Sequence, residues 1–128
     1  MIVFDASVLV AYLDGEDEHH NDAERLLAEE VDDDFGANSL TLAEVFVAPA
    51  RDGRLDTVRS TLRELEIAEL PFPADAAEKL AQLRVDTGLK MPDCCVLLAA
   101  EPLRARVATF DDRLGKAAQQ RNIEAMGR

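Results

Sequence analysis

The sequence predicts an α/β protein, a three-layer α/β/α sandwich with a mostly parallel central sheet. Short apolar runs alternate with amphipathic helical segments along the chain, which is typical of parallel sheets covered by helices on both faces. Of the 128 residues, 48% are hydrophobic, enough for a sizeable core despite 31% charged residues. No repeat, low-complexity tract or linker divides the chain, so we expect a single domain over residues 1–128.

In the first half of the chain, apolar periodicity defines each element, and an acid, hydroxyl, glycine or proline starts or stops it. Residues 2–4 form an apolar run, and the apolar positions that follow recur at helical spacing. The predicted elements are a strand at 2–4, a helix that stops at Gly15, a surface helix over 20–30, a strand at 34–38, and a helix capped by Ser39 or Thr41 that Pro49 and Gly53 end.

The second half repeats this alternation. Leucines at three- and four-residue steps predict two further amphipathic helices, and Pro92 suits the first turn of an apolar, buried helix. The predicted elements are a helix at 55–65, a strand at 67–70, a helix at 75–84 before Gly88, a buried helix at 93–100, a strand at 106–110, a helix opened by Asp111 or Asp112, and a last short strand at Ile123.

The composition limits where the protein works and what it binds. The 26 acidic and 14 basic residues give a net charge of −12, which opposes general electrostatic binding of nucleic acid. A polyanionic substrate therefore needs compensating positive charge at its binding site. No apolar stretch is long enough to cross a membrane, and the N-terminus lacks a basic signal-peptide region, so we expect a cytoplasmic protein. Cys94 and Cys95 are sequence neighbours and are expected to be reduced, partly buried thiols.

Four acids lie near the ends of predicted elements. Asp5 and Asp111 follow strands, Glu44 lies on the first turns of the helix after the second strand, and Asp93 begins the apolar helix. Ligands of parallel sheets bind outside the carboxyl ends of the strands, so these acids could converge on one edge. The alternative is structural, because acids are frequent in this chain and Asp caps helices. Asp93 is the best single clue, since an ionised group in apolar surroundings is costly unless it is capped or metal-bound.

Clustered carboxylates would call for a divalent cation. They repel one another, and Mg²⁺ or Mn²⁺ compensates while leaving positions for water and substrate phosphates. A paired-metal site can deprotonate a water on one side of a phosphodiester and stabilise the leaving oxygen on the other. Such a site supplies the positive charge that an acidic phosphodiesterase needs to bind its substrate.

Four segments resemble the acidic motifs of the PIN-domain family, in the right order and at the right spacing across essentially the whole chain. They are 2–7 (IVFDAS), 39–45 (SLTLAEV), 89–94 (LKMPDC) and 108–114 (ATFDDRL). They are especially similar to those of the VapC ribonuclease toxins of type II toxin–antitoxin systems. The resemblance implies a three-layer α/β sandwich, a divalent-metal-dependent endoribonuclease that cleaves RNA, a cognate VapB-type antitoxin and a homodimer.

Position by position, the resemblance assigns the acidic quartet to Asp5, Glu44, Asp93 and Asp111. It implies that Asp5 and Asp93 are direct ligands of Mg²⁺ or Mn²⁺, and that Glu44 and Asp111 bind the metal directly or through water. Ser7 matches the small hydroxyl residue after the first acid, where it could hold a carboxylate or a metal-bound water or could cap the helix.

The two neighbouring acids in the last motif have different expected roles. The Thr-x-Asp pattern selects Asp111 as the fourth acid of the quartet. Asp112 is left as a helix N-terminal residue or an outer partner of the site.

The remaining candidates have weaker support. His19 and His20 lie in an acidic run that is most simply a solvated loop entering a helix, and we assign them no catalytic role. The densest basic cluster could contact RNA phosphates or an acidic partner, or form a solvated helix face paired with neighbouring acids. That cluster comprises Arg51, Arg54, Arg59 and Arg63.

Two other function classes remain open at this point. A phosphoryl-transfer enzyme or receiver domain could use Asp5 as a phosphorylated nucleophile, but the chain lacks a second aspartate two residues later, and no receiver-like acidic pair follows the first strand. A catalytically silent PIN-like binding module could use the acidic pocket to hold a basic side chain of a partner.

Overall fold

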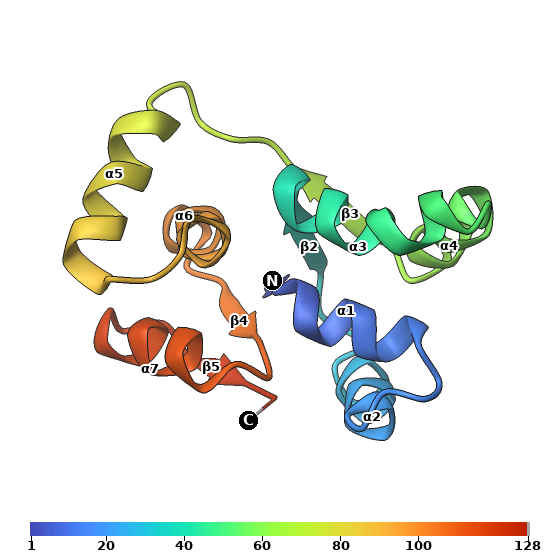
Figure 1. The fold of residues 1–128 in the computed structure, drawn as a ribbon. Helices are drawn as coiled ribbons and strands as arrows, with labels where there is room; N and C mark the ends of the chain where they lie inside the picture. The colour runs from blue at the N-terminus through green and yellow to red at the C-terminus, as the bar shows by residue number, and fades with distance from the viewer. Residues whose placement is uncertain (128) are drawn as a thin grey trace.

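The computed structural model describes residues 1–127, and its centre is a five-stranded sheet in the order β3-β2-β1-β4-β5 (Figure 1). Every neighbouring pair of strands is parallel. The strands are β1 (Ile2–Phe4), β2 (Phe35–Asn38), β3 (Ile67–Leu70), β4 (Arg106–Ala108) and β5 (Ala125–Met126). The predicted three-layer α/β/α class is therefore confirmed.

The helices form two layers, one on each face of the sheet (Figure 1). The layers consist of α1 (Ala6–Leu13), α2 (His20–Glu29), α3 (Ser39–Arg51) and α4 (Leu55–Glu64) on one face, and α5 (Ala76–Thr87), α6 (Met91–Leu103) and α7 (Asp112–Gln120) on the other. Successive side chains of a strand point to opposite faces, so Ile2 and Phe4 enter the core beneath α1–α4, while Val3 enters the core beneath α5–α7.

The parallel arrangement brings the carboxyl ends of all strands to one edge of the sheet, which we call the carboxyl edge. Helices α1, α3 and α7 begin there because they follow β1, β2 and β4. Helix α6 leads into the start of β4, so its C-terminal end lies at the opposite edge and its N-terminal end at the carboxyl edge. This arrangement positions the candidate site.

Two predicted helix boundaries in the first half were wrong. The cap of α3 is Asn38, whose side chain accepts a hydrogen bond from the Thr41 N–H at 2.8 Å, rather than Ser39 or Thr41. Pro49 lies inside α3 and is buried, and its carbonyl accepts from the Arg54 N–H at 2.8 Å. Pro49 removes one backbone donor near the C-terminal end of the helix, which nevertheless continues to Arg51.

The C-terminal elements also differ from the predicted ones. Helix α6 continues beyond Ala100 to Leu103 and ends at Arg104 in the left-handed conformation. The last strand is Ala125–Met126, because Ile123 donates its N–H to Ala118 and packs into the core instead of joining the sheet.

In residues 1–127, no helix combines the length and apolarity needed to span a bilayer.

Candidate active site

The four predicted acids all lie where helices begin at the carboxyl edge. Asp5 is the N-cap of α1, Asp111 is the N-cap of α7, and Asp93 lies in the first turn of α6. Glu44 lies on the second turn of α3. Strands β2, β1 and β4 are adjacent, so the segments that follow them are neighbours in space.

Electrostatics shows that these carboxylates lie close together. Partial burial, followed by the negative charges of Asp5, Asp111 and Glu44, raises the pKa of Asp93 to about 6 against the opposing charge of Lys90. The pKa of Glu44, whose side chain is exposed, is also raised, first by partial desolvation against neighbouring groups and then by the charge of Asp5. The fold therefore places four acids from distant parts of the chain in one region of negative electrostatic potential.

Asp5 is the most firmly held of the four. Its Oδ2 accepts two hydrogen bonds, from Ser7 Oγ at 2.7 Å and from Thr109 Oγ1 at 2.8 Å. Its backbone N–H donates to the Ala108 carbonyl at 2.9 Å, which extends the pairing of β1 with β4. Ser7 Oγ in turn accepts from the Phe110 N–H at 3.1 Å. Two hydroxyls therefore fix one oxygen of Asp5 and leave the other available.

Thr109 links two members of the quartet, a role that the sequence analysis did not assign. It is fully buried; its Oγ1 donates to Asp5 and accepts from the Asp111 N–H at 3.0 Å. The signal in the sequence was the Thr-x-Asp pattern, which we used only to select Asp111. The hydroxyl orients Asp5 and fixes the backbone that carries Asp111.

Asp111 and Asp112 differ in their local roles. Asp111 Oδ1 caps α7 by accepting from the N–H groups of Arg113 at 2.8 Å and Leu114 at 3.2 Å, and the charge of Asp111 is among those that raise the pKa of Asp93. Asp112 is the exposed first residue of α7. Asp111 thus combines a structural cap with a place in the acidic field.

The chemistry of this donor set fits a hard divalent cation. No ion pair within residues 1–127 neutralises any acid of the quartet: Asp5, Glu44, Asp93 and Asp111. In the same residues, no three His, Cys, Asp or Glu side chains form a group that could hold a metal ion. A Mg²⁺ ion is commonly bound by one or two carboxylates together with waters and substrate phosphates, so a closed protein cage is not required.

The model of the PIN domain family matches residues 2–120 of the chain. The chain belongs to the PIN domain family. No curated protein matches the sequence.

Solved structures share the fold at low sequence identity. A toxin–antitoxin complex from Klebsiella pneumoniae matches with a TM-score of 0.76 and 22% identity over 90% of both chains. VapC20 of Mycobacterium tuberculosis, described as a toxin that cleaves the sarcin–ricin loop, matches with a TM-score of 0.75 and 17% identity over 91% of this chain and 95% of the other. VapBC2 from Rickettsia felis, bound to a promoter DNA fragment, matches with a TM-score of 0.74 and 15% identity over 98% of both chains.

The two histidines of this PIN domain have different surroundings. His20 contacts the Ala11 carbonyl through Nδ1 and Glu24 through Nε2, both at 2.8 Å, so it ties α2 to α1. His19 stacks on Phe110, with ring centroids 4.7 Å apart and an angle of 24° between the planes. Phe110 follows Thr109, so His19 lies on the α2 side of the candidate site.

The predicted basic cluster divides into paired and unpaired residues. Arg54 pairs with Asp52 at 3.6 Å, and Arg59 with Asp56 at 2.7 Å, whereas Arg51 and Arg63 have no ion pair within residues 1–127. All four arginines are exposed.

Both cysteines belong to α6 and are buried in the interior of the protein. Cys94 and Cys95 are both free and buried, and burial raises the pKa of both thiols. Thiols of this kind are unreactive packing residues.

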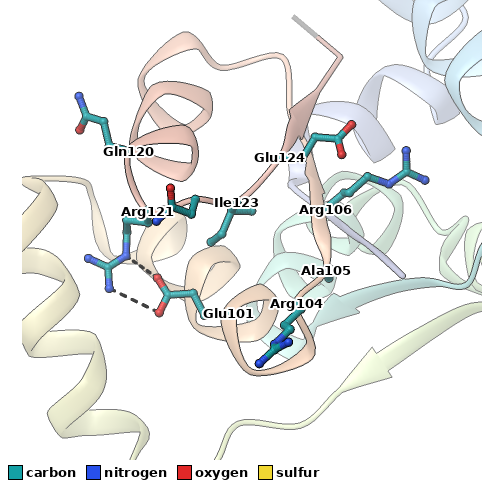
Figure 2. A pocket seen from close by; sticks show the side chains of 9 residues that line it. Glu101, Arg104, Ala105, Arg106, Gln120, Arg121, Ile123 and Glu124 are labelled. Atoms are coloured by element: carbon teal, nitrogen blue, oxygen red, sulfur yellow. Dashed lines mark hydrogen bonds and ion pairs between the residues drawn. The ribbon is translucent and has the colours of Figure 1, made fainter.

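A surface hollow of about 720 Å³ lies away from the quartet. It is at the opposite edge of the sheet, where α6 ends and β4 begins, and Figure 2 shows Arg121 paired with Glu101 on its wall. Arg106, also on its wall, pairs with Glu30 at 2.7 Å and Asp33 at 2.9 Å. A smaller hollow of about 390 Å³ between α1 and α3 includes Glu44. The volume of a hollow therefore does not identify the candidate site in this fold.

Proposed function

We propose that this chain is a divalent-metal-dependent endoribonuclease that acts as the toxin of a type II toxin–antitoxin system. The observation that carries the proposal is the acidic quartet at the carboxyl edge of a PIN domain, where three neighbouring carboxylates help to raise the pKa of Asp93 to about 6. A field of this kind needs a cation, and a bound cation lets an acidic protein work on a phosphodiester.

Asp5 and Asp93 are the proposed direct ligands, with Glu44 and Asp111 binding directly or through water. When bound, Mg²⁺ or Mn²⁺ would activate a water and stabilise the charge that develops on the phosphodiester. Ser7 and Thr109 hold one oxygen of Asp5 in place, which leaves its other oxygen for the ion.

Asp111 Oδ1 is occupied by two N–H groups of α7, so its other oxygen is the one available to a water or to the ion. Glu44 is exposed and accepts no hydrogen bond within residues 1–127, so its carboxylate is available to orient the attacking water. Asp112, at the start of α7, is proposed as an outer partner of the site.

The proposed partners follow from the structural neighbours. One of those structures is described as a toxin–antitoxin complex, one as a toxin that cleaves the sarcin–ricin loop, and one as VapBC2 bound to promoter DNA. For this chain we propose an RNA substrate, a cognate VapB-type antitoxin, a homodimeric state and a cytoplasmic location. An arginine of the antitoxin is a suitable inhibitor, because a guanidinium pairs with the same carboxylates that hold the metal.

The test is cleavage of RNA by purified protein with and without added metal. We expect cleavage with Mg²⁺ or Mn²⁺ and none with EDTA, and we expect Asp5→Asn and Asp93→Asn to reduce the rate by at least about 100-fold. Asp32→Asn is the matched control, since Asp32 is exposed just before β2 at the opposite edge. Cleavage retained by both site variants would refute the proposal.

Calorimetry separates the enzyme from a silent binding module. An enzyme of the proposed kind should bind Mn²⁺ in a manner that depends on Asp93, whereas a purely structural pocket should bind none. A protein-bound phosphate formed after exposure to a phosphodonor would instead favour the phosphoryl-transfer alternative.

A further inference from the structure

Six cations away from the candidate site form ion pairs, whereas five others within residues 1–127 do not: Arg51, Arg63, Arg84, Arg104 and Lys116. Each of these pairs joins a lysine or arginine to a carboxylate on the same helix or a neighbouring element. The cations concerned are Arg25, Arg54, Arg59, Lys79, Arg106 and Arg121. A paired guanidinium or ammonium is partly neutralised and is a poor anchor for a further anion.

Two cations beside the quartet have no such partner in the part of the chain that the structure describes. Lys90 immediately precedes α6, is exposed, and lies three residues before Asp93. Arg113 lies in the first turn of α7, is exposed, and is two residues from Asp111, to which its backbone N–H donates. Both side chains begin at the carboxyl edge, on the α6–α7 side of the acids.

The side of the site formed by the α1–α2 connection carries four acids and no lysine or arginine. The connection from α1 to α2 carries Asp14, Glu16, Asp17 and Glu18, and Asp14 lines the same hollow as Glu44. The backbone phosphates of a nucleic acid would be repelled by this connection and attracted by Lys90 and Arg113. The charge around the site is therefore asymmetric.

We propose that Lys90 and Arg113 bind backbone phosphates of the RNA next to the scissile bond, so that the strand crosses the α6–α7 side of the site and avoids the α1–α2 connection. The inference rests on the proposed function and adds the path of the substrate to it. Phosphate contacts fix the position of a strand without reading its sequence, so both residues are positioning residues and not catalytic ones.

The experiment measures binding and cleavage separately. Binding of a fluorescein-labelled single-stranded RNA of about 12 nucleotides is followed by anisotropy in EDTA over a series of salt concentrations. Each lost phosphate contact on a single strand lowers the slope of log K against log salt by about 0.7, so Lys90→Ala and Arg113→Ala should each show that decrease. In metal-dependent cleavage, each should raise KM roughly three- to fivefold, with kcat within about twofold of the wild type.

The fold provides a matched control on the same helix. Arg104 is exposed and has no ion pair within residues 1–127, and it ends α6 at the opposite edge, about 20 Å from Lys90 at the rise of an α-helix. Arg104→Ala should leave both the salt slope and KM unchanged. Lys90→Arg should restore the slope that Lys90→Ala loses, which a merely structural role of Lys90 would not explain.

Three results would overturn the inference: no salt-dependent RNA binding by the wild type, an unchanged slope in Lys90→Ala and Arg113→Ala, or an equal decrease in Arg104→Ala. Failure of the proposed function has a different signature. In that case the wild type would not cleave RNA with Mg²⁺ or Mn²⁺, while the salt slopes of the variants would still decide where the strand lies.

Discussion

Replacing Asp93 with asparagine should make the metal-free protein more stable at alkaline pH. The pKa of Asp93 rises from 3.8 to about 6 in the folded state, so the folded protein holds this proton more tightly than the unfolded chain does. The unfolding free energy therefore falls as pH rises from about 4 to about 6 and stays low above that range. An asparagine side chain cannot ionise, so the variant avoids the cost.

The size of this effect follows from the pKa values. Each pKa unit is worth about 1.4 kcal/mol, which gives an upper limit of about 3 kcal/mol at pH 8 and roughly half of that at pH 5. Asp93 is only half-buried, and screening by solvent reduces these values to about 2 and 1 kcal/mol. For a domain of this size, 2 kcal/mol corresponds to an increase in Tm of about 7 °C.

The assay is thermal unfolding followed by circular dichroism, in EDTA, at pH 5 and pH 8. Asp93→Asn should unfold at a higher temperature than the wild type, with a larger difference at pH 8 than at pH 5. Asp32→Asn, the exposed control at the opposite edge, should match the wild type at both pH values. An Asp93→Asn variant no more stable than the wild type at pH 8, or equally stabilised at both pH values, would refute the electrostatic reasoning.

The contacts of the site and of the sheet predict the outcome of four other changes. Mg²⁺ at saturating concentration should raise the Tm of the wild type and leave that of Asp93→Asn nearly unchanged; an equal rise in both would place the metal elsewhere. Thr109→Val, which keeps the side-chain shape but loses two hydrogen bonds, should cost about 1–2 kcal/mol in urea unfolding and lower cleavage, and an unchanged rate would remove its orienting role. Gly36→Ala should cost about 1 kcal/mol, because its Cβ would lie 2.9–3.2 Å from Leu70, whereas Gly15→Ala, with open space around it, should not destabilise by crowding; equal effects would refute this explanation. Arg106→Met should lower the Tm most near neutral pH and progressively less below about pH 4, since Arg106 lowers the pKa of the two carboxylates that it binds; a difference that does not depend on pH would contradict this.

Local chemistry explains why two acids of the site could be placed from the sequence. Asp5 and Asp111 each follow an apolar strand, and a parallel sheet brings such residues to a common edge whatever the details of packing. The position of Glu44 near the start of a helix was similarly predictable. Asp93 follows no strand, and its distance from the other acids depends on the direction in which α6 crosses the sheet.

The errors in the sequence prediction lie where packing overrides local preference. Ser39 and Thr41 are good caps by residue type, yet Asn38 caps α3 because it is buried at the end of β2 with its side chain against the Thr41 N–H. Isoleucine is common in strands, but the side chain of Ile123 packs in the core beneath α7 and its backbone does not join the sheet.

The sequence alone determined the order of the elements, the three-layer class and the four acidic motifs, because hydrophobic period and residue type are local properties that survive without knowledge of contacts. The tertiary structure alone decided that Thr109 links Asp5 to Asp111, and that three other carboxylates help to hold the pKa of Asp93 near 6. Hydrogen bonds act over about 3 Å and screened charge effects over about 10 Å, and residues more than 100 positions apart in the chain, such as Asp5 and Thr109, come that close only after folding.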